Sequence, residues 1–180
     1  MLVLSLALSL LVHAVHAAFC FDAAGKTVLE TASTARGCIV TKDLGTGQVQ
    51  FTLFSAAKGW FGFGVSSVSD TRQMGPADVV VVYNDPTGVS QARSFLTGPA
   101  PTIKANPAKP WSKTNLNGTA PAWASIAVSV TRPITASAEG VPLSIGLEAT
   151  PNTFIFSWSD ETLIFGENGA IGLTPHGANR

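Results

Sequence analysis

The chain has few residues that can bind a transition metal. Its 180 residues include only two methionines, three histidines and two cysteines. Met1, His13 and His16 lie in the first 17 residues, which we interpret below as a leader, so the rest of the chain keeps only Met74 and His176. One imidazole excludes a multi-histidine metal centre. A thioether and an imidazole are, however, a known pair of axial ligands for an electron-transfer haem.

Charge is also scarce. Charged residues make up 12% of the chain, and eleven basic residues balance eleven acidic ones. A chain with no net charge and no basic run does not match a nucleic-acid-binding protein, so we expect no such partner. No segment beyond the N-terminal region is apolar over the roughly 20 residues that a membrane span needs. The sequence therefore predicts no membrane span.

The N-terminus has the pattern of a secretory leader. Residues 2–11 are a short apolar run, and residues 15–17 (VHA) form a small-residue cleavage pattern. We interpret residues 1–17 as a signal peptide and expect a secreted, extracellular protein. The alternative is that this run is a buried strand or helix. Removing 17 of the 180 residues leaves 163, at 18–180, which suits one domain.

Two features of the chain fit export. Cys20 and Cys38 are the only cysteines, and an even count in an exported protein predicts one disulfide, closing a loop of 18 residues. Residues 117–119 (NGT) make Asn117 an N-glycosylation site if the host is eukaryotic. There is no Cys-x-x-Cys-His motif, so any haem would be held without a covalent link.

Hydrophobic periodicity predicts an all-β fold. Apolar residues alternate with polar or small ones at 49–53, 61–65, 126–130 and 143–147, which is typical of strands with one face on a core. The run 79–83 predicts a strand buried on both faces, and 85–88 (DPTG) predicts a turn joining it to a strand at 89–95. Residues 98–121 contain five prolines and predict one long surface loop. Short strands with turns between them favour a β-sandwich or barrel.

Taken alone, the two metal-binding candidates allow more than one interpretation. Met74 lies in a loop with polar neighbours and a Gly-Pro turn after it, whereas buried methionines usually occupy apolar, periodic faces. An ordinary loop methionine and a solvated near-terminal His176 also explain the pattern. Trp111, in the long loop, and Trp123, just after it, are candidates to line a haem edge or a sugar-binding surface.

Several segments, taken in order, resemble the DOMON superfamily over about 25–178. The segment 59–66 (GWFGFGVS), then Met74, then 77–81 (ADVVV), is similar to the core signature of that superfamily. The later segments 128–133 (VSVTRP), 154–158 (FIFSW) and His176-Gly177 resemble its Arg-Pro strand, its penultimate strand and its terminal histidine.

The resemblance implies an immunoglobulin-like β-sandwich. In the cytochrome branch of the superfamily, which includes the haem domain of cellobiose dehydrogenases, the residues at these positions are the axial ligands of a b-type haem. The resemblance therefore implies Met74 and His176 as ligands of haem b. It also implies single-electron transfer with a separate partner protein, either a flavin dehydrogenase or a copper-dependent polysaccharide monooxygenase.

Two alternatives remain at this point. Some DOMON domains lack the two ligands and are thought to bind sugars, so a haem-free carbohydrate-binding sandwich is the main alternative. An enzyme is the other, but a Ser–His–Asp hydrolase would have to use His176, and no Gly-x-Ser-x-Gly motif is present. Because a haem with both axial positions filled by protein has no open site, the cytochrome hypothesis predicts electron transfer rather than catalysis at the iron.

Overall fold

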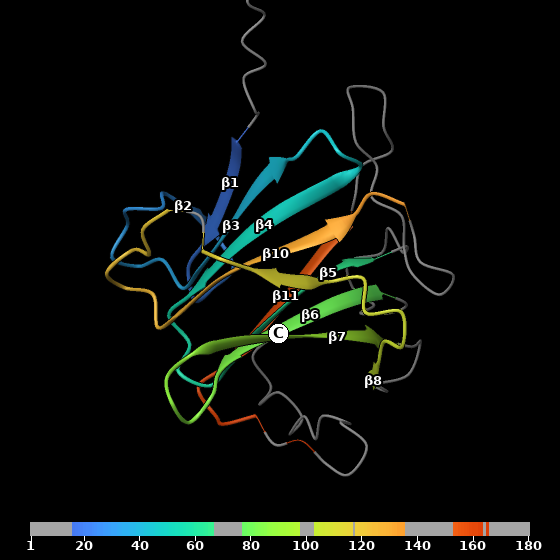
Figure 1. Ribbon diagram of the computed structural model, residues 1–180. Coiled ribbons are helices and arrows are strands. Elements are labelled where there is room, and N and C mark those ends of the chain that lie inside the picture. The colour runs from blue at the N-terminus through green and yellow to red at the C-terminus, as the bar shows by residue number, and fades with distance from the viewer. Residues whose placement is uncertain are drawn as a thin grey trace, which may run out of the picture.

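Two antiparallel β-sheets face each other and make up the described structure (Figure 1). The structure is a computed structural model and describes residues 16–66, 77–97, 103–116, 118–135, 153–163 and 165. Sheet A has the strand order β2-β1-β3-β4-β10-β9, and sheet B has the order β11-β5-β6-β7-β8. The strands are β1 (His16–Phe21), β2 (Thr27–Val28), β3 (Gly37–Asp43), β4 (Gln48–Ser55), β5 (Trp60–Ser66), β6 (Ala77–Asn84), β7 (Ser90–Thr97), β8 (Ile103–Ala105), β9 (Ser112–Thr114), β10 (Ile126–Pro133) and β11 (Thr153–Ser159).

The sequence-based predictions of the all-β class and of the main strands are confirmed. Strands β4, β5 and β10 cover the alternating segments, and β6 and β7 form the predicted hairpin. The regular structure of the described residues is entirely β. The strand predicted at 143–147 lies outside the described residues.

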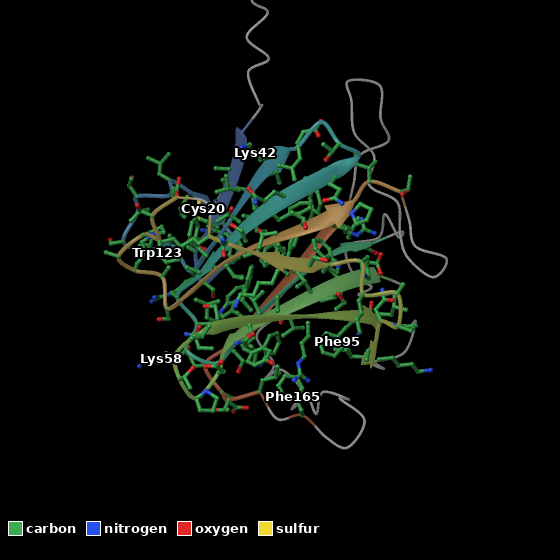
Figure 2. All side chains as sticks on the ribbon, in the orientation of Figure 1. Cys20, Lys42, Lys58, Phe95, Trp123 and Phe165 are labelled. Atoms are coloured by element: carbon green, nitrogen blue, oxygen red, sulfur yellow. A yellow bond between two sulfur atoms is a disulfide. The ribbon has the colours of Figure 1, made fainter. Side chains whose placement is uncertain are left out.

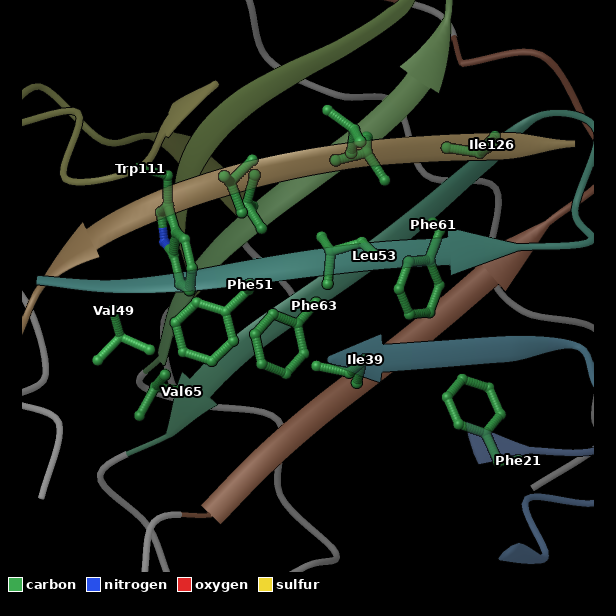
Figure 3. Packing of buried hydrophobic residues seen from close by; sticks show 14 residues of the cluster. Phe21, Ile39, Val49, Phe51, Leu53, Phe61, Phe63, Val65, Trp111 and Ile126 are labelled. Carbon is green, nitrogen blue, oxygen red and sulfur yellow. The ribbon is translucent and has the colours of Figure 1, made fainter. Parts of the chain in front are cut away.

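The core lies between the sheets and is filled by alternate residues of facing strands (Figure 3). Strand β4 supplies Val49, Phe51 and Leu53 from sheet A, and strand β5 supplies Phe61, Phe63 and Val65 from sheet B. The other members of this cluster are Phe21, Ile39, Val80, Val82, Trp111, Ile126, Val128 and Val130. Side chains that alternate along a strand reach opposite faces, so each sheet presents a second, outer face as well.

The prediction that β5 buries only one face is wrong, because all seven of its residues are buried. On the outer face of sheet B, Trp60 packs with Val79, Val81 and Leu163. Gly64 lies beneath this layer, and a Cβ added there would stand 2.7 Å from the carbonyl oxygen of Asp78. A residue larger than glycine at position 64 would therefore clash with the neighbouring strand β6.

The segment predicted as one long loop, 98–121, contains two short strands. Strand β8 extends the edge of sheet B and β9 extends the edge of sheet A. Between them Trp111 is buried in the core, and the Ser94 hydroxyl on β7 accepts a hydrogen bond from its backbone N–H at 3.3 Å. The prolines predicted a loop. Edge strands this short need only a few ladder hydrogen bonds, so they can form between prolines.

A cross-strand disulfide confirms the predicted pairing of Cys20 and Cys38. The two residues are register partners on β1 and β3, with sulfurs 2.01 Å apart. They lie on the outer face of sheet A beside Phe54, where Trp123 and Ala124 also pack. Strand β1 begins at His16, so cleavage after Ala17 would leave Ala18–Phe21 of this strand, with Cys20 included.

The β6–β7 turn is held by one carboxylate. Asp85 accepts hydrogen bonds from the Thr87 hydroxyl at 2.6 Å, the Gln91 amide at 2.8 Å and the backbone N–H of Val89 at 3.0 Å. The Thr87 and Gln91 side chains contribute most to lowering the pKa of Asp85 from 3.8 to about 2. The charged form is therefore the one that stabilises the turn.

We expect the Asp85 contribution to stability to be complete above pH 3.8 and to disappear as the pH falls towards 2. The Asp85→Asn variant should lose less stability than the parent over that interval. Denaturant unfolding at several acidic pH values measures the difference. Asp160→Asn serves as the control carboxylate, and parallel pH profiles for parent and Asp85→Asn would contradict the assignment.

We expect reduction of the Cys20–Cys38 disulfide to destabilise the fold by about 3 kcal/mol, because a closed loop of this length restricts the unfolded chain. Guanidinium unfolding with and without a reductant measures this loss. The double variant Cys20→Ala/Cys38→Ala should match the reduced parent and should not respond to reductant. Two reactive thiols in the unfolded, unreduced protein would contradict the bridge.

Candidate functional site

The structure fixes the strands on both sides of the Met74 segment. Met74 and His176 lie outside the described residues, as does Asn117. Strand β5 ends at Ser66 and β6 begins at Ala77, and these two residues are register partners. The segment that contains Met74 therefore leaves and re-enters the sheet at the same end. We call this the Met74 end of the sandwich.

Aromatic rings fill the core at the Met74 end. Phe63 has Phe51 at 5.2 Å, Phe154 at 5.5 Å and Trp111 at 5.9 Å, measured between ring centroids. Figure 3 shows Trp111, Phe51 and Phe63 grouped beside Val49 and Val65, away from Phe21. Phe154 stacks on Phe63 yet is 44% exposed, although its ring belongs to the core side of β11. The apolar interior therefore reaches the surface here.

Beside these rings, a buried ion pair joins the two sheets. Asp78 on β6 and Arg132 on β10 are 0% and 1% exposed, and Arg132 Nη2 lies 2.5 Å from Asp78 Oδ2. Asn106 is also buried and donates from Nδ2 to Asp78 Oδ1 at 2.9 Å. The guanidinium carbon of Arg132 stands 5.4 Å from the centre of the Trp111 ring. The group carries no net charge, but it makes the last core layer polar.

The Trp111 indole N–H is buried and has no hydrogen-bond acceptor among the described residues. Buried polar groups nearly always have a partner, and an unsatisfied donor costs about 1–3 kcal/mol. This donor lies in the same layer as Arg132. The Met74 end therefore combines a cluster of aromatic rings with a buried ion pair and one indole N–H that has no acceptor among the described residues.

Sequence reasoning missed the ion pair, although the sequence contained a signal for it. Asp78 lies two residues before Val80 and four before Val82, so it shares the inward face of its strand with these core valines. Arg132 follows Val128 and Val130 at the same two-residue spacing. A charged residue at an inward position of an apolar strand needs a partner. Two such residues of opposite charge, on two different strands, therefore predict an ion pair between them.

The other residues singled out in the sequence lie elsewhere. Trp123 donates from Nε1 to the carbonyl oxygen of Glu30 at 3.0 Å, on the outer face of sheet A. Trp111 is a core residue rather than part of an exposed loop. Neither tryptophan forms an exposed stacking platform.

The described ranges contain no cluster of three or more His, Cys, Asp or Glu side chains suited to a metal ion. Within the same ranges, no helix has the length and hydropathy of a membrane span. Comparison with known proteins adds nothing to this, since no family model and no curated protein matches the chain.

We expect Arg132→Met to destabilise the fold by about 3–5 kcal/mol, because it leaves the Asp78 carboxylate buried without its cation. Combining it with Asp78→Asn should recover much of the loss. Urea unfolding of the two single variants and the double variant gives the coupling energy. Arg93→Met is the control, and an Arg132→Met loss no larger than the control loss would contradict a structural role for the pair.

Proposed function

We propose that this chain is a secreted b-type cytochrome of the DOMON type, with Met74 and His176 as axial ligands of one non-covalent haem b. The proposal includes an immunoglobulin-like arrangement of the sandwich. The two antiparallel sheets support that arrangement, because the chain passes between them from β4 to β5, from β8 to β9 and from β10 to β11. The Cys20–Cys38 disulfide fits an oxidising compartment and so supports secretion.

The single observation that carries the proposal is the aromatic cluster at the Met74 end, which reaches the surface at Phe154. A porphyrin is a flat, mostly apolar ring with two carboxylates, and binding sites for such ligands are lined by apolar and aromatic side chains with a few polar groups. Phe154 is 44% exposed and supplies an apolar face, and the buried rings of Phe63 and Phe51 pack behind it. The buried Trp111 N–H supplies a hydrogen-bond donor beside it. These residues fit the group.

Chain length permits His176 to join Met74. Phe165 packs on Tyr83 and Arg93, on the outer face of sheet B. His176 follows Phe165 by eleven positions, and eleven extended residues span up to about 36 Å. An eight-residue strand such as β6 is about 26 Å long. The chain after Phe165 is therefore long enough to reach either end of the sandwich.

Bound haem supplies a one-electron couple. The Met74 thioether is a soft ligand that favours ferrous iron, and the His176 imidazole is the stronger donor. If both residues held the iron, they would leave it no open position for oxygen or substrate, which would favour electron transfer over catalysis. The electron would pass to a separate protein, and a flavin dehydrogenase and a copper polysaccharide monooxygenase are the two partner classes implied by the resemblance.

We expect the purified protein to be red, with sharp absorption bands after reduction by dithionite. Met74→Ala should keep part of its haem, bind carbon monoxide and have a lower reduction potential, because the ligand that favours ferrous iron is gone. His176→Ala should lose most of its haem. Absorption spectra and potentiometric titration measure all three effects.

Gln73→Ala is the matched control, since it alters a neighbour of Met74 without removing a ligand, and it should keep the parent's spectrum and potential. If the parent takes up no haem when supplied with it, or if both ligand variants keep the parent's spectrum, the cytochrome proposal fails.

A further inference from the structure

The stretch 86–138 contains five basic residues and no acidic one. The five are Arg93, Lys104, Lys109, Lys113 and Arg132. Arg132 is buried in its pair with Asp78, and Arg93 packs on Phe165 at the outer face of sheet B. The three lysines are exposed, and the described residues give none of them an ion-pair partner. Their charge is therefore free to act on something outside the chain.

The three lysines lie on one segment, 103–114, which we call the basic flank. It begins as β8 on the edge of sheet B and ends as β9 on the edge of sheet A, so it runs along one side of the sandwich. Figure 1 shows the connection between these two strands on the right of the view, on the same side as the tip of β10. Phe95, which pairs with Ala105 of β8, lies well away from Lys42 and Lys58 in Figure 2. Those two lysines are therefore not part of the basic flank.

Two buried contacts place the basic flank beside the Met74 end. Asn106 donates to Asp78, near the start of β6, and its side-chain oxygen accepts a backbone N–H two residues further on at 3.0 Å. The centre of the Trp111 ring lies 5.4 Å from the guanidinium carbon of Arg132, near the end of β10. The turn that leads to Lys109 is thus attached to the buried ion pair. The lysines therefore have a fixed place next to the aromatic cluster.

Lys109 has a backbone conformation that glycine would adopt more easily. Its φ is +45°, in the left-handed region, which no other non-glycine residue of the described ranges occupies. A side chain is disfavoured there because its Cβ approaches the following carbonyl oxygen. Outliers of this kind are concentrated at functional sites. An exposed lysine with such a backbone is better explained by its charge than by the needs of the fold.

We propose that the basic flank docks the acidic face of a redox partner protein. The inference rests on the proposed cytochrome function, because the flank lies beside the end at which the haem would be held. Charges at the rim of an interface steer a partner of opposite charge and mainly raise the association rate. Asp43, at the end of β3, is separated from β9 by β4 and β10, so it lies away from the flank. Electron transfer needs a partner with its own redox centre, which favours a protein over an acidic polysaccharide.

The experiment follows oxidation of the reduced, haem-loaded protein by two blue copper proteins in a stopped-flow instrument. Plastocyanin has an acidic patch, and azurin has none. The reaction with plastocyanin should be fast at about 0.01 M ionic strength and slow at about 1 M, because the Debye length falls from about 30 Å to about 3 Å. The reaction with azurin should depend little on salt.

The variants Lys104→Gln, Lys109→Gln and Lys113→Gln should each slow the plastocyanin reaction at low salt about threefold, the effect of one charge pair about 6 Å apart in water. The triple variant should slow it about thirtyfold if these effects add. Lys26→Gln is the matched control and should keep the parent's rate, because Lys26 precedes β2 at the opposite edge of sheet A.

Lys109→Gly separates the charge from the backbone. It should be at least as stable as the parent in urea, because glycine adopts the left-handed conformation freely, and yet it should react with plastocyanin as slowly as Lys109→Gln. A rate equal to the parent's would show that the lysine charge has no part in docking.

Docking is also measured without electron transfer, by amide NMR of the labelled protein titrated with plastocyanin that holds zinc in place of copper. Shifts confined to the basic flank support docking. If they occur in a protein that takes up no haem, the acidic docking surface stands and only electron transfer is rejected. The docking proposal is overturned if the triple variant reacts as fast as the parent, if azurin is as salt-dependent as plastocyanin, or if polygalacturonate shifts the same amides as strongly.

Discussion

The ion pair between Asp78 and Arg132 is the interaction on which the Met74 end of the molecule depends. It joins β6 of sheet B to β10 of sheet A through the interior, and Asn106 and Trp111 pack around it. Burying two charges costs several kcal/mol per ion before their attraction offsets it. An apolar pair of similar volume would often be as stable. Stability alone therefore gives a weak reason for placing these charges in the core.

Position gives a better reason. The core is apolar along most of its length, and the charged layer lies where β6 begins and β10 ends, four residues after Met74 in the chain. A polar layer at this point marks the end of the hydrophobic core but does not cover it. Phe154 therefore stays stacked on Phe63 and partly exposed. The ion pair thus both holds the sheets together and bounds the aromatic cluster at this end of the core.

The sequence predicted those features that depend on local order. Alternation along β4 and β10, the Asp85 turn and the even cysteine count gave the strands, the hairpin and the disulfide correctly. The sequence did not predict that Trp60 and Leu163 cover the outer face of β5, because burial of a second face depends on segments distant in sequence. Strands β8 and β9 were missed because three residues show no period. The ion pair needed two distant strands to be considered together, while Met74 and His176 remain predictions from the sequence.

Strand β4 presents different residues to the two sides of sheet A. Phe51 points into the core towards the aromatic rings, while Gln50 and Thr52, its neighbours in the chain, face a hollow on the outer side. Successive side chains of a strand reach opposite faces, so one short segment contributes to both surfaces while the sheet separates them. The backbone of β4 is fixed on both sides by β3 and β10. The position of Phe51 in the aromatic cluster is therefore set by strand pairing on both sides of β4.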